Sequence, residues 1–169
     1  MLDVFNSLKR LAQSIQQIHQ PFYLKPIIKA ITAIAFDFGT RRIGLAVGNS
    51  ITGSSQALTP ITADQDDARF TLIAAQIKEW APDQLVVGLP CHPDGAEHAM
   101  TAKARRFGNQ LHGRFGLPVA WVDERYTSAV LESDPSFKKS QASKKDGGLD
   151  SESARLILEQ YFSECLGES

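Results

Sequence analysis

The sequence is short of cysteine, of net charge and of long apolar runs. Its two cysteines, Cys91 and Cys165, lack the spacing of a zinc site or a disulfide framework, which is typical of a protein of the reducing cytoplasm. A net charge of −1 gives no overall attraction to nucleic acid, so a polyanion site has to come from local clustering. No apolar run reaches membrane length, and Asp3, Lys9 and Arg10 interrupt the region where a secretion signal needs an apolar core. We therefore expect a cytoplasmic protein.

What remains is the composition of an ordinary globular chain. The 169 residues suit one domain, with 43% hydrophobic and 22% charged residues. We expect this domain over residues 30–169, preceded by a helical extension over residues 1–29. In the extension, apolar residues recur at steps of four and three until two prolines end the pattern: Val4, Leu8, Leu11, Ile15, Ile18, then Pro21 and Pro26. Such a helix either packs on the domain or binds a second copy or another partner.

Strands come first in the predicted domain. Apolar runs indicate strands over residues 31–37, 43–48 and 57–62, and Pro60 puts the third at a sheet edge or a bulge. A helix should follow, capped by Asp64, Asp66 or Asp67, with an inward face of Phe70, Ile73, Ala74 and Ile77.

Helices and strands then alternate. We expect strands at 84–89 and 119–124, a helix between them that buries Ala104, Phe107 and Leu111, a short helix at 127–131 and a polar loop at 133–148. A final helix should run from about Asp150 to Cys165 and turn one face inward: Ala154, Ile157, Leu158, Tyr161 and Cys165. This order predicts an α/β fold, a mixed sheet with helices on its faces.

Three carboxylates stand at the ends of these elements. Asp37 ends the first strand before a tight turn, Glu124 ends the last strand, and Asp150 opens the final helix. Two carboxylates 4 Å apart repel each other by about 4 kcal/mol at an effective dielectric of 20, and a divalent cation reverses that sign. Each has another possible role: Asp37 as a turn cap, Glu124 as a partner of Arg125, and Asp150 as a helix cap. Together, such oxygen ligands favour Mg²⁺ or Mn²⁺.

The sequence resembles the YqgF family of Holliday-junction-resolvase-like proteins, which are assigned to pre-16S rRNA processing. Four blocks carry the resemblance, in order and at sensible spacing: D-F-G-T-R-R-I-G-L-A-V, V-V-G-L-P followed by P-D-G, V-D-E-R-Y-T-S, and D-S-E-S-A-R-L-I-L. They extend over most of the chain beyond the extension. The resemblance implies a ribonuclease H-like fold, with a five-stranded mixed sheet whose first three strands are antiparallel and with helices on both faces.

The resemblance also implies that Asp37, Glu124 and Asp150 are the catalytic acids and metal ligands. In the wider group the second acid ends the fourth strand, whereas that strand here ends without one and Glu124 takes the role. Asp94 and Asp123 are the alternatives for this position.

The chemistry to expect is metal-dependent phosphodiester hydrolysis. One Mg²⁺ would activate a water, and a second, shared through Asp37, would stabilise the leaving oxygen. Arg41, Arg42 and Arg125 are the nearest candidates to bind substrate phosphate. The implied substrate is structured nucleic acid, either the 5′ end of pre-16S rRNA or a branched DNA such as a Holliday junction. The protein acts as a monomer or a homodimer.

Other basic and aromatic residues could extend such a surface. One helix carries Lys103, Arg105, Arg106 and Arg114, and a basic loop spans 138–145; both either follow a phosphate backbone or form a solvated face. Tyr126 could stack on a base, whereas Trp121 is expected in the core.

Two other classes of protein compete with a nuclease. The D-x-G-T turn at 37–40 also occurs in ATP-binding proteins of the actin type, but those need two such halves and this chain has one. The third class is a nucleic-acid-binding module that has lost catalysis, which the presence of all three acids disfavours.

Overall fold

The computed structural model describes residues 29–91, 99–124 and 148–167, which form one five-stranded sheet with helices on both faces. The strand order is β3-β2-β1-β4-β5. The strands are β1 (Thr32–Phe38), β2 (Arg42–Asn49), β3 (Ser54–Thr62), β4 (Gln84–Leu89) and β5 (Val119–Asp123). β1, β2 and β3 pair antiparallel, whereas β4 is parallel to β1 and β5 to β4. The predicted mixed sheet is confirmed.

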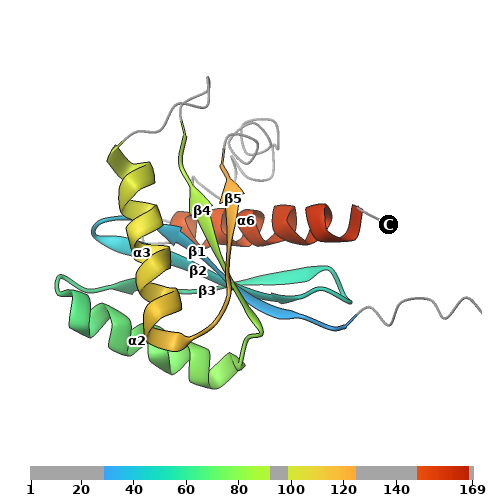
Figure 1. The fold of residues 1–169 in the computed structure, drawn as a ribbon, viewed down its shortest axis with the longest axis horizontal. Helices are drawn as coiled ribbons and strands as arrows, with labels where there is room; N and C mark the ends of the chain where they lie inside the picture. The colour runs from blue at the N-terminus through green and yellow to red at the C-terminus, as the bar shows by residue number, and fades with distance from the viewer. Residues whose placement is uncertain (1–28, 92–98, 125–147, 168–169) are drawn as a thin grey trace, which may run out of the picture.

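Three helices cover the two faces of this sheet: α2 (Asp66–Trp80), α3 (Ala99–Phe115) and α6 (Gly148–Gly167). Figure 1 shows the hairpins of β1, β2 and β3 lying between α2 and α6. None of these three described helices is long and apolar enough to cross a membrane. The predictions for residues 1–28, 92–98 and 125–147 lie outside the described residues; they include Asp94, Arg125 and Tyr126.

Local sequence patterns predicted most helices and strands, but they predicted some of the ends of these elements less well. β3 is an edge strand whose pairing with β2 shifts between Ile43 and Leu45, as expected near Pro60. The predicted aspartate cap of α2 is wrong, because Gln65 occupies the cap position and makes no side-chain cap bond. Asp66 and Asp67 lie inside the first turn and face Arg69 and Arg114 instead. α6 begins two residues before Asp150, so Asp150 lies in its first turn.

The face covered by α2 and α3 is built from large side chains. Phe70 and Ile73 of α2 and Phe107 and Leu111 of α3 pack there against the alternating large residues of the strands: Ile34, Phe36, Ile43, Leu45, Leu85 and Val87. Ala74, expected on this face, is exposed.

The face covered by α6 is built from small side chains. Ala33, Ala35 and Ala46 point toward α6, which contributes Ala154, Ile157, Leu158 and Phe162. The expectation that Cys165 belongs to the inward face is wrong, because Cys165 is exposed and Phe162 is buried. Phe162 reaches Gly48 near the end of β2, so the next turn of the helix has little strand left to cover.

Candidate active site

Asp37 lies one residue before the end of β1, on the α6 face of the sheet. Side chains alternate along a strand, so Asp37 shares this face with Ala33 and Ala35. Burial and the nearby negative charge of Asp150 raise the pKa of Asp37 to about 6, while a hydrogen bond with Ser153 lowers it. A carboxylate at this strand end is therefore costly to keep ionised unless a positive charge joins it.

Asp150 is brought to Asp37 by a glycine on the neighbouring strand. Gly44 is the register partner of Asp37 in β2, and a Cβ there would collide with the backbone carbonyl of Asp150. The next amide, that of Leu45, donates to the Ser151 hydroxyl across 3.5 Å. The first turn of α6 therefore rests directly on the backbone of β2, beside Asp37.

Glu124 reaches the same place from the other side of β1. It directly follows β5, and its amide donates to the Leu89 carbonyl at the end of β4 across 3.2 Å. Its carboxylate lies over Gly88, where a Cβ would collide with Oε1. Burial and the charges of Asp37 and Asp123 raise the pKa of Glu124 to about 8.

Asp37 thus interacts with both other predicted acids. Asp123, the alternative to Glu124, is the register partner of Leu89 and acts on Glu124 through its charge. Asp150 carries an ion pair with Arg42, 3.6 Å between Nη1 and Oδ2, and both side chains are about two-fifths exposed (41% and 39%). Arg41 is exposed on the turn between β1 and β2. Of the two predicted phosphate contacts that lie within the described residues, Arg42 is the one paired with an acid of the site.

The donor chemistry suits a divalent cation, although the ligands are not gathered into a finished site. Within the described parts of the chain, no group of three His, Cys, Asp or Glu side chains is spaced to hold a metal ion. The charge of Asp37 nevertheless raises the cost of ionising Glu124, and the charge of Asp150 raises that of Asp37, which a cation beside these partly buried carboxylates would relieve. Asp37 and Glu124 are the carboxylates here that could hold a divalent cation, with Asp150, now paired with Arg42, beside them.

The basic residues of α3 are partly used within the fold. The guanidinium of Arg105 lies 5.9 Å from the centre of the Trp121 ring, and that of Arg114 lies 4.2 Å from the centre of Phe70. Arg114 also lies 4.0 Å from Asp67. Trp121 packs against the large-residue core, as predicted. These contacts favour a structural surface over a phosphate track.

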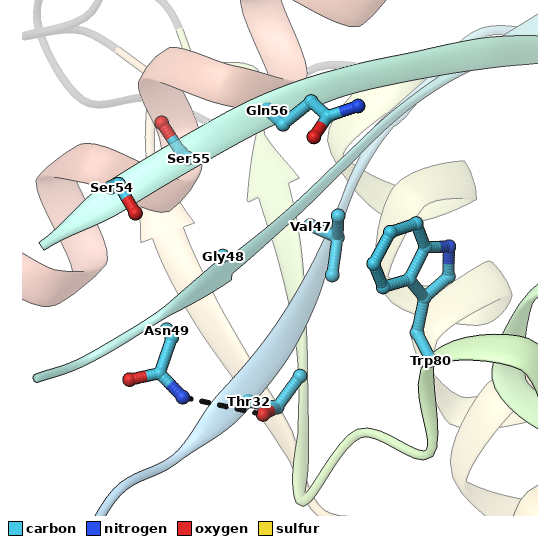
Figure 2. Close-up of a pocket in the computed structure, with 8 residues that line it drawn as sticks. All are labelled: Thr32, Val47, Gly48, Asn49, Ser54, Ser55, Gln56 and Trp80. Carbon is cyan, nitrogen blue, oxygen red and sulfur yellow. Dashed lines mark hydrogen bonds between the residues drawn. The ribbon is translucent and has the colours of Figure 1, made fainter. Parts of the chain in front are cut away.

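A separate hollow lies at the opposite end of β1 (Figure 2). It measures about 490 Å³ and is bounded by the start of β1, the end of β2, the start of β3 and Trp80 at the end of α2. Asn49 donates to the Thr32 hydroxyl across 3.4 Å at its rim. Thr32 and Val47 alternate onto the α2 face, whereas the acids lie on the α6 face. The hollow is therefore not part of the carboxylate site.

Sequence reasoning overlooked the glycines and one arginine. Gly44 and Gly88 interrupt apolar strands, and a glycine within a strand often marks a close backbone approach, so this signal was present. Arg69, which is almost fully buried, gives no such signal, because its i+3 spacing from Asp66 is equally typical of an exposed helix pair.

Comparison with known proteins agrees with this architecture. The sequence pattern of the RuvX family, described as Holliday junction resolvase, matches residues 31–164. A protein of Polynucleobacter necessarius, provisionally named a pre-16S rRNA nuclease, is 61% identical over 143 residues, covering 83% of this chain and 92% of the relative. A protein of Burkholderia vietnamiensis with the same name is 51% identical over 133 residues, covering 79% and 89%.

Among solved structures, RuvC of T. thermophilus in complex with a Holliday junction substrate superimposes with a TM-score of 0.50. It is 13% identical, and the match covers 81% of this chain and 96% of RuvC, so it speaks for the fold alone. The fold is ribonuclease H-like. With nearly the whole described domain matched by the family pattern and by curated relatives, the chain belongs to the RuvX (YqgF) family.

Proposed function

We propose that this protein is a metal-dependent nuclease that hydrolyses phosphodiester bonds in structured RNA, and that its substrate is the 5′ end of pre-16S rRNA in the cytoplasm. The observation that carries the proposal is the approach of Glu124 and Asp150 to Asp37 from two different elements. The relatives that share half or more of their residues with this chain bear the corresponding name.

Asp37 and Glu124 would hold Mg²⁺ or Mn²⁺, with Asp150 as a third ligand. A bound divalent ion supplies a polarised water and neutralises charge on the phosphate. Without it, the raised pKa of Glu124, about 8, leaves a proton on that carboxyl at neutral pH. Metal binding would therefore displace a proton from Glu124 to solvent. Arg42, already beside Asp150, would bind a non-bridging phosphate oxygen.

A second candidate is the resolution of branched DNA. The family description supports it, since it names a Holliday junction resolvase. The phosphodiester group is chemically the same in both substrates. Selection between RNA and branched DNA therefore depends on residues that bind the nucleic acid away from the acids.

The direct test is cleavage of two substrates side by side. A 5′-extended 16S precursor RNA and a four-way DNA junction are incubated with the protein and Mg²⁺ or Mn²⁺. We expect RNA cleavage that Asp37→Asn, Glu124→Gln and Asp150→Asn each reduce strongly. Asp83→Asn is the matched control, because Asp83 is a carboxylate at the other end of β1, where it accepts from the Thr32 amide. Wild-type activity in all three site variants would contradict the assigned acids.

Metal binding can be measured without activity. Added Mg²⁺ should raise the melting temperature of the wild type and of Asp83→Asn at pH 8, and should have little effect on Asp37→Asn. If no substrate is cleaved while nucleic acid still binds, the protein is instead a non-catalytic binding module.

The extension is proposed as a unit separate from the nuclease domain, with the boundary at residues 29 and 30. Sedimentation of the full chain against residues 30–169 would test whether residues 1–29 make a dimer. Mapping of ribosomal RNA ends in cells depleted of the protein would test the assigned substrate.

A further inference from the structure

Arg69 is a charged side chain buried in the fold and not used by the proposed chemistry. It lies in the first turn of α2 and is 7% exposed. Its Nη2 donates to the carbonyls of Thr40 and Ala63, each across 3.0 Å, and its Nη1 donates to Asp66 Oδ1 across 3.4 Å.

The acceptors show what this arginine joins. Thr40 lies in the turn between β1 and β2, and Ala63 lies in the link between β3 and α2. The turn is tight, since a Cβ on Gly39 would lie 2.5 Å from the Arg42 carbonyl. One side of the turn carries Asp37 and the other carries Arg42. One guanidinium therefore holds the segment that connects the central acid to the arginine beside Asp150.

The burial of this charge distinguishes Arg69 from Arg42. Removing a guanidinium from water is costly unless hydrogen bonds replace the lost solvent. A guanidinium directs donors from separate nitrogens in a planar fork, whereas an ammonium carries its three donors on one nitrogen. Arg42 instead keeps 41% of its side chain exposed and is paired with Asp150. Arg69 is therefore suited to hold the turn in place. Arg42 is suited to exchange Asp150 for another anionic partner.

We propose that Arg69 is a positioning residue that fixes the β1–β2 turn so that Arg42 is held ready for the substrate phosphate. The inference rests on the proposed function for the role of Arg42, whereas the support of the turn rests on the contacts of Arg69 alone.

Arg69→Met removes the three donors and keeps much of the apolar stem. Arg69→Lys keeps the charge but places its donors on one nitrogen instead of the two that reach these acceptors. Arg114→Met is the matched control: Arg114 also packs on α2, over Phe70, but belongs to α3 and lies beside Asp67 rather than the turn. Should Arg69→Met fail to fold, Arg69→Lys gives the same comparison in a milder form.

The first measurement is the backbone order of the turn by NMR relaxation. In the wild type and in Arg114→Met, the amides of residues 39–42 should have order parameters near ~0.85, falling below ~0.6 in Arg69→Met. Unchanged order in Arg69→Met and Arg69→Lys would overturn the inference, whatever the enzyme cleaves.

The second measurement is a double-mutant cycle on the binding of a 5′-extended 16S precursor RNA without divalent metal. Arg42→Ala should weaken binding about tenfold in the wild type and less than about twofold in Arg69→Met, because the turn no longer presents Arg42. Additive effects would overturn the link between Arg69 and Arg42. If Arg42→Ala alone has no effect on binding, the phosphate contact in the proposed function fails, and the order parameters decide for Arg69.

Discussion

The two faces of the sheet differ in the size of the side chains that the strands present. Toward α2 and α3 the strands present Phe, Ile, Leu and Val, and Phe70, Phe107 and Leu111 of the helices pack against them. Toward α6 they present Ala33, Ala35 and Ala46, with Gly44, Gly48 and Gly88 between. Side chains separate the helices from the first face, whereas parts of α6 touch the strand backbone of the second.

This difference separates stability from chemistry within one sheet. Large interlocking side chains bury more apolar surface, so the α2/α3 face supplies much of the hydrophobic stabilisation. Small residues let α6 and Glu124 come close enough for three carboxylates to interact. The electrostatic cost of burying these carboxylates close together is seen in the raised pKa values of Asp37 and Glu124. Four variants or conditions can break or sharpen the comparison.

The largest effect is expected from Asp37→Asn on the α6 face. It should lower the cleavage rate by more than about a thousandfold, corresponding to more than ~4 kcal/mol, because the shared acid is lost. The free energy of unfolding should stay the same or rise, since a partly buried charge and its repulsion disappear. Single-turnover cleavage and urea unfolding measure the two quantities. A stable Asp37→Asn that cleaves at the wild-type rate would contradict this assignment.

Phe107→Ala should have the opposite profile. Phe107 stacks on Phe38 with ring centres 4.8 Å apart and meets Phe36 at 5.8 Å. Its removal should cost about 3–4 kcal/mol of unfolding free energy, while cleavage below the melting temperature changes only a few-fold. Phe107→Leu should lose less stability. A loss of cleavage comparable to that of Asp37→Asn would show that the two faces are not separable.

Gly44→Ala tests the close approach of α6. The new methyl group would collide with the Asp150 carbonyl, so the helix or the strand has to shift. We expect a loss of about 2 kcal/mol in unfolding free energy and a much larger relative loss of cleavage than Phe107→Ala shows. Gly113→Ala is the control, since a Cβ there meets nothing within 4 Å and should stabilise α3 by about 0.5–1 kcal/mol. Wild-type cleavage in Gly44→Ala would remove this glycine from the description of the site.

The fourth test changes no residue and concerns the dependence of unfolding free energy on pH without divalent metal. Asp37 and Glu124 have folded pKa values of about 6 and about 8, above the ordinary values of 3.8 and 4.5. The folded protein therefore binds more protons than the unfolded chain, so this stability is present below about pH 4 and is lost as pH rises to about 8. Urea unfolding across this window should show the fall in the wild type and in Phe107→Ala. The fall in unfolding free energy with pH should be smaller in Glu124→Gln. An equal fall in that variant would contradict the raised pKa of Glu124.

The sequence predicted where helices and strands lie better than it predicted which of their residues face the core or cap a helix. Residues 84–89 form β4 as expected, and Asp37, Glu124 and Asp150 lie at or beside element ends as expected. The inward faces were less certain, because a helical stripe does not say where the strand beneath it ends, and Cys165 is exposed for this reason. Ala74 is exposed as well. The predicted cap of α2 was also wrong, because Gln65 occupies the cap position and Asp66 and Asp67 lie inside the first turn.

Apolar alternation and breakers along the chain determined the order of strands and helices, because these signals act over a few residues. The four motifs and the resemblance they carry then identified the family, and with it the acids to expect. Tertiary structure alone decided which contacts those residues make: Asp150 over Gly44, Glu124 over Gly88, Arg42 with Asp150, and Arg69 under Thr40. These pairs lie about 30 to 110 residues apart along the chain, so no local pattern encodes them. The contacts of Asp150 follow from the packing of α6 on a face of small residues, whereas that of Arg69 comes from α2.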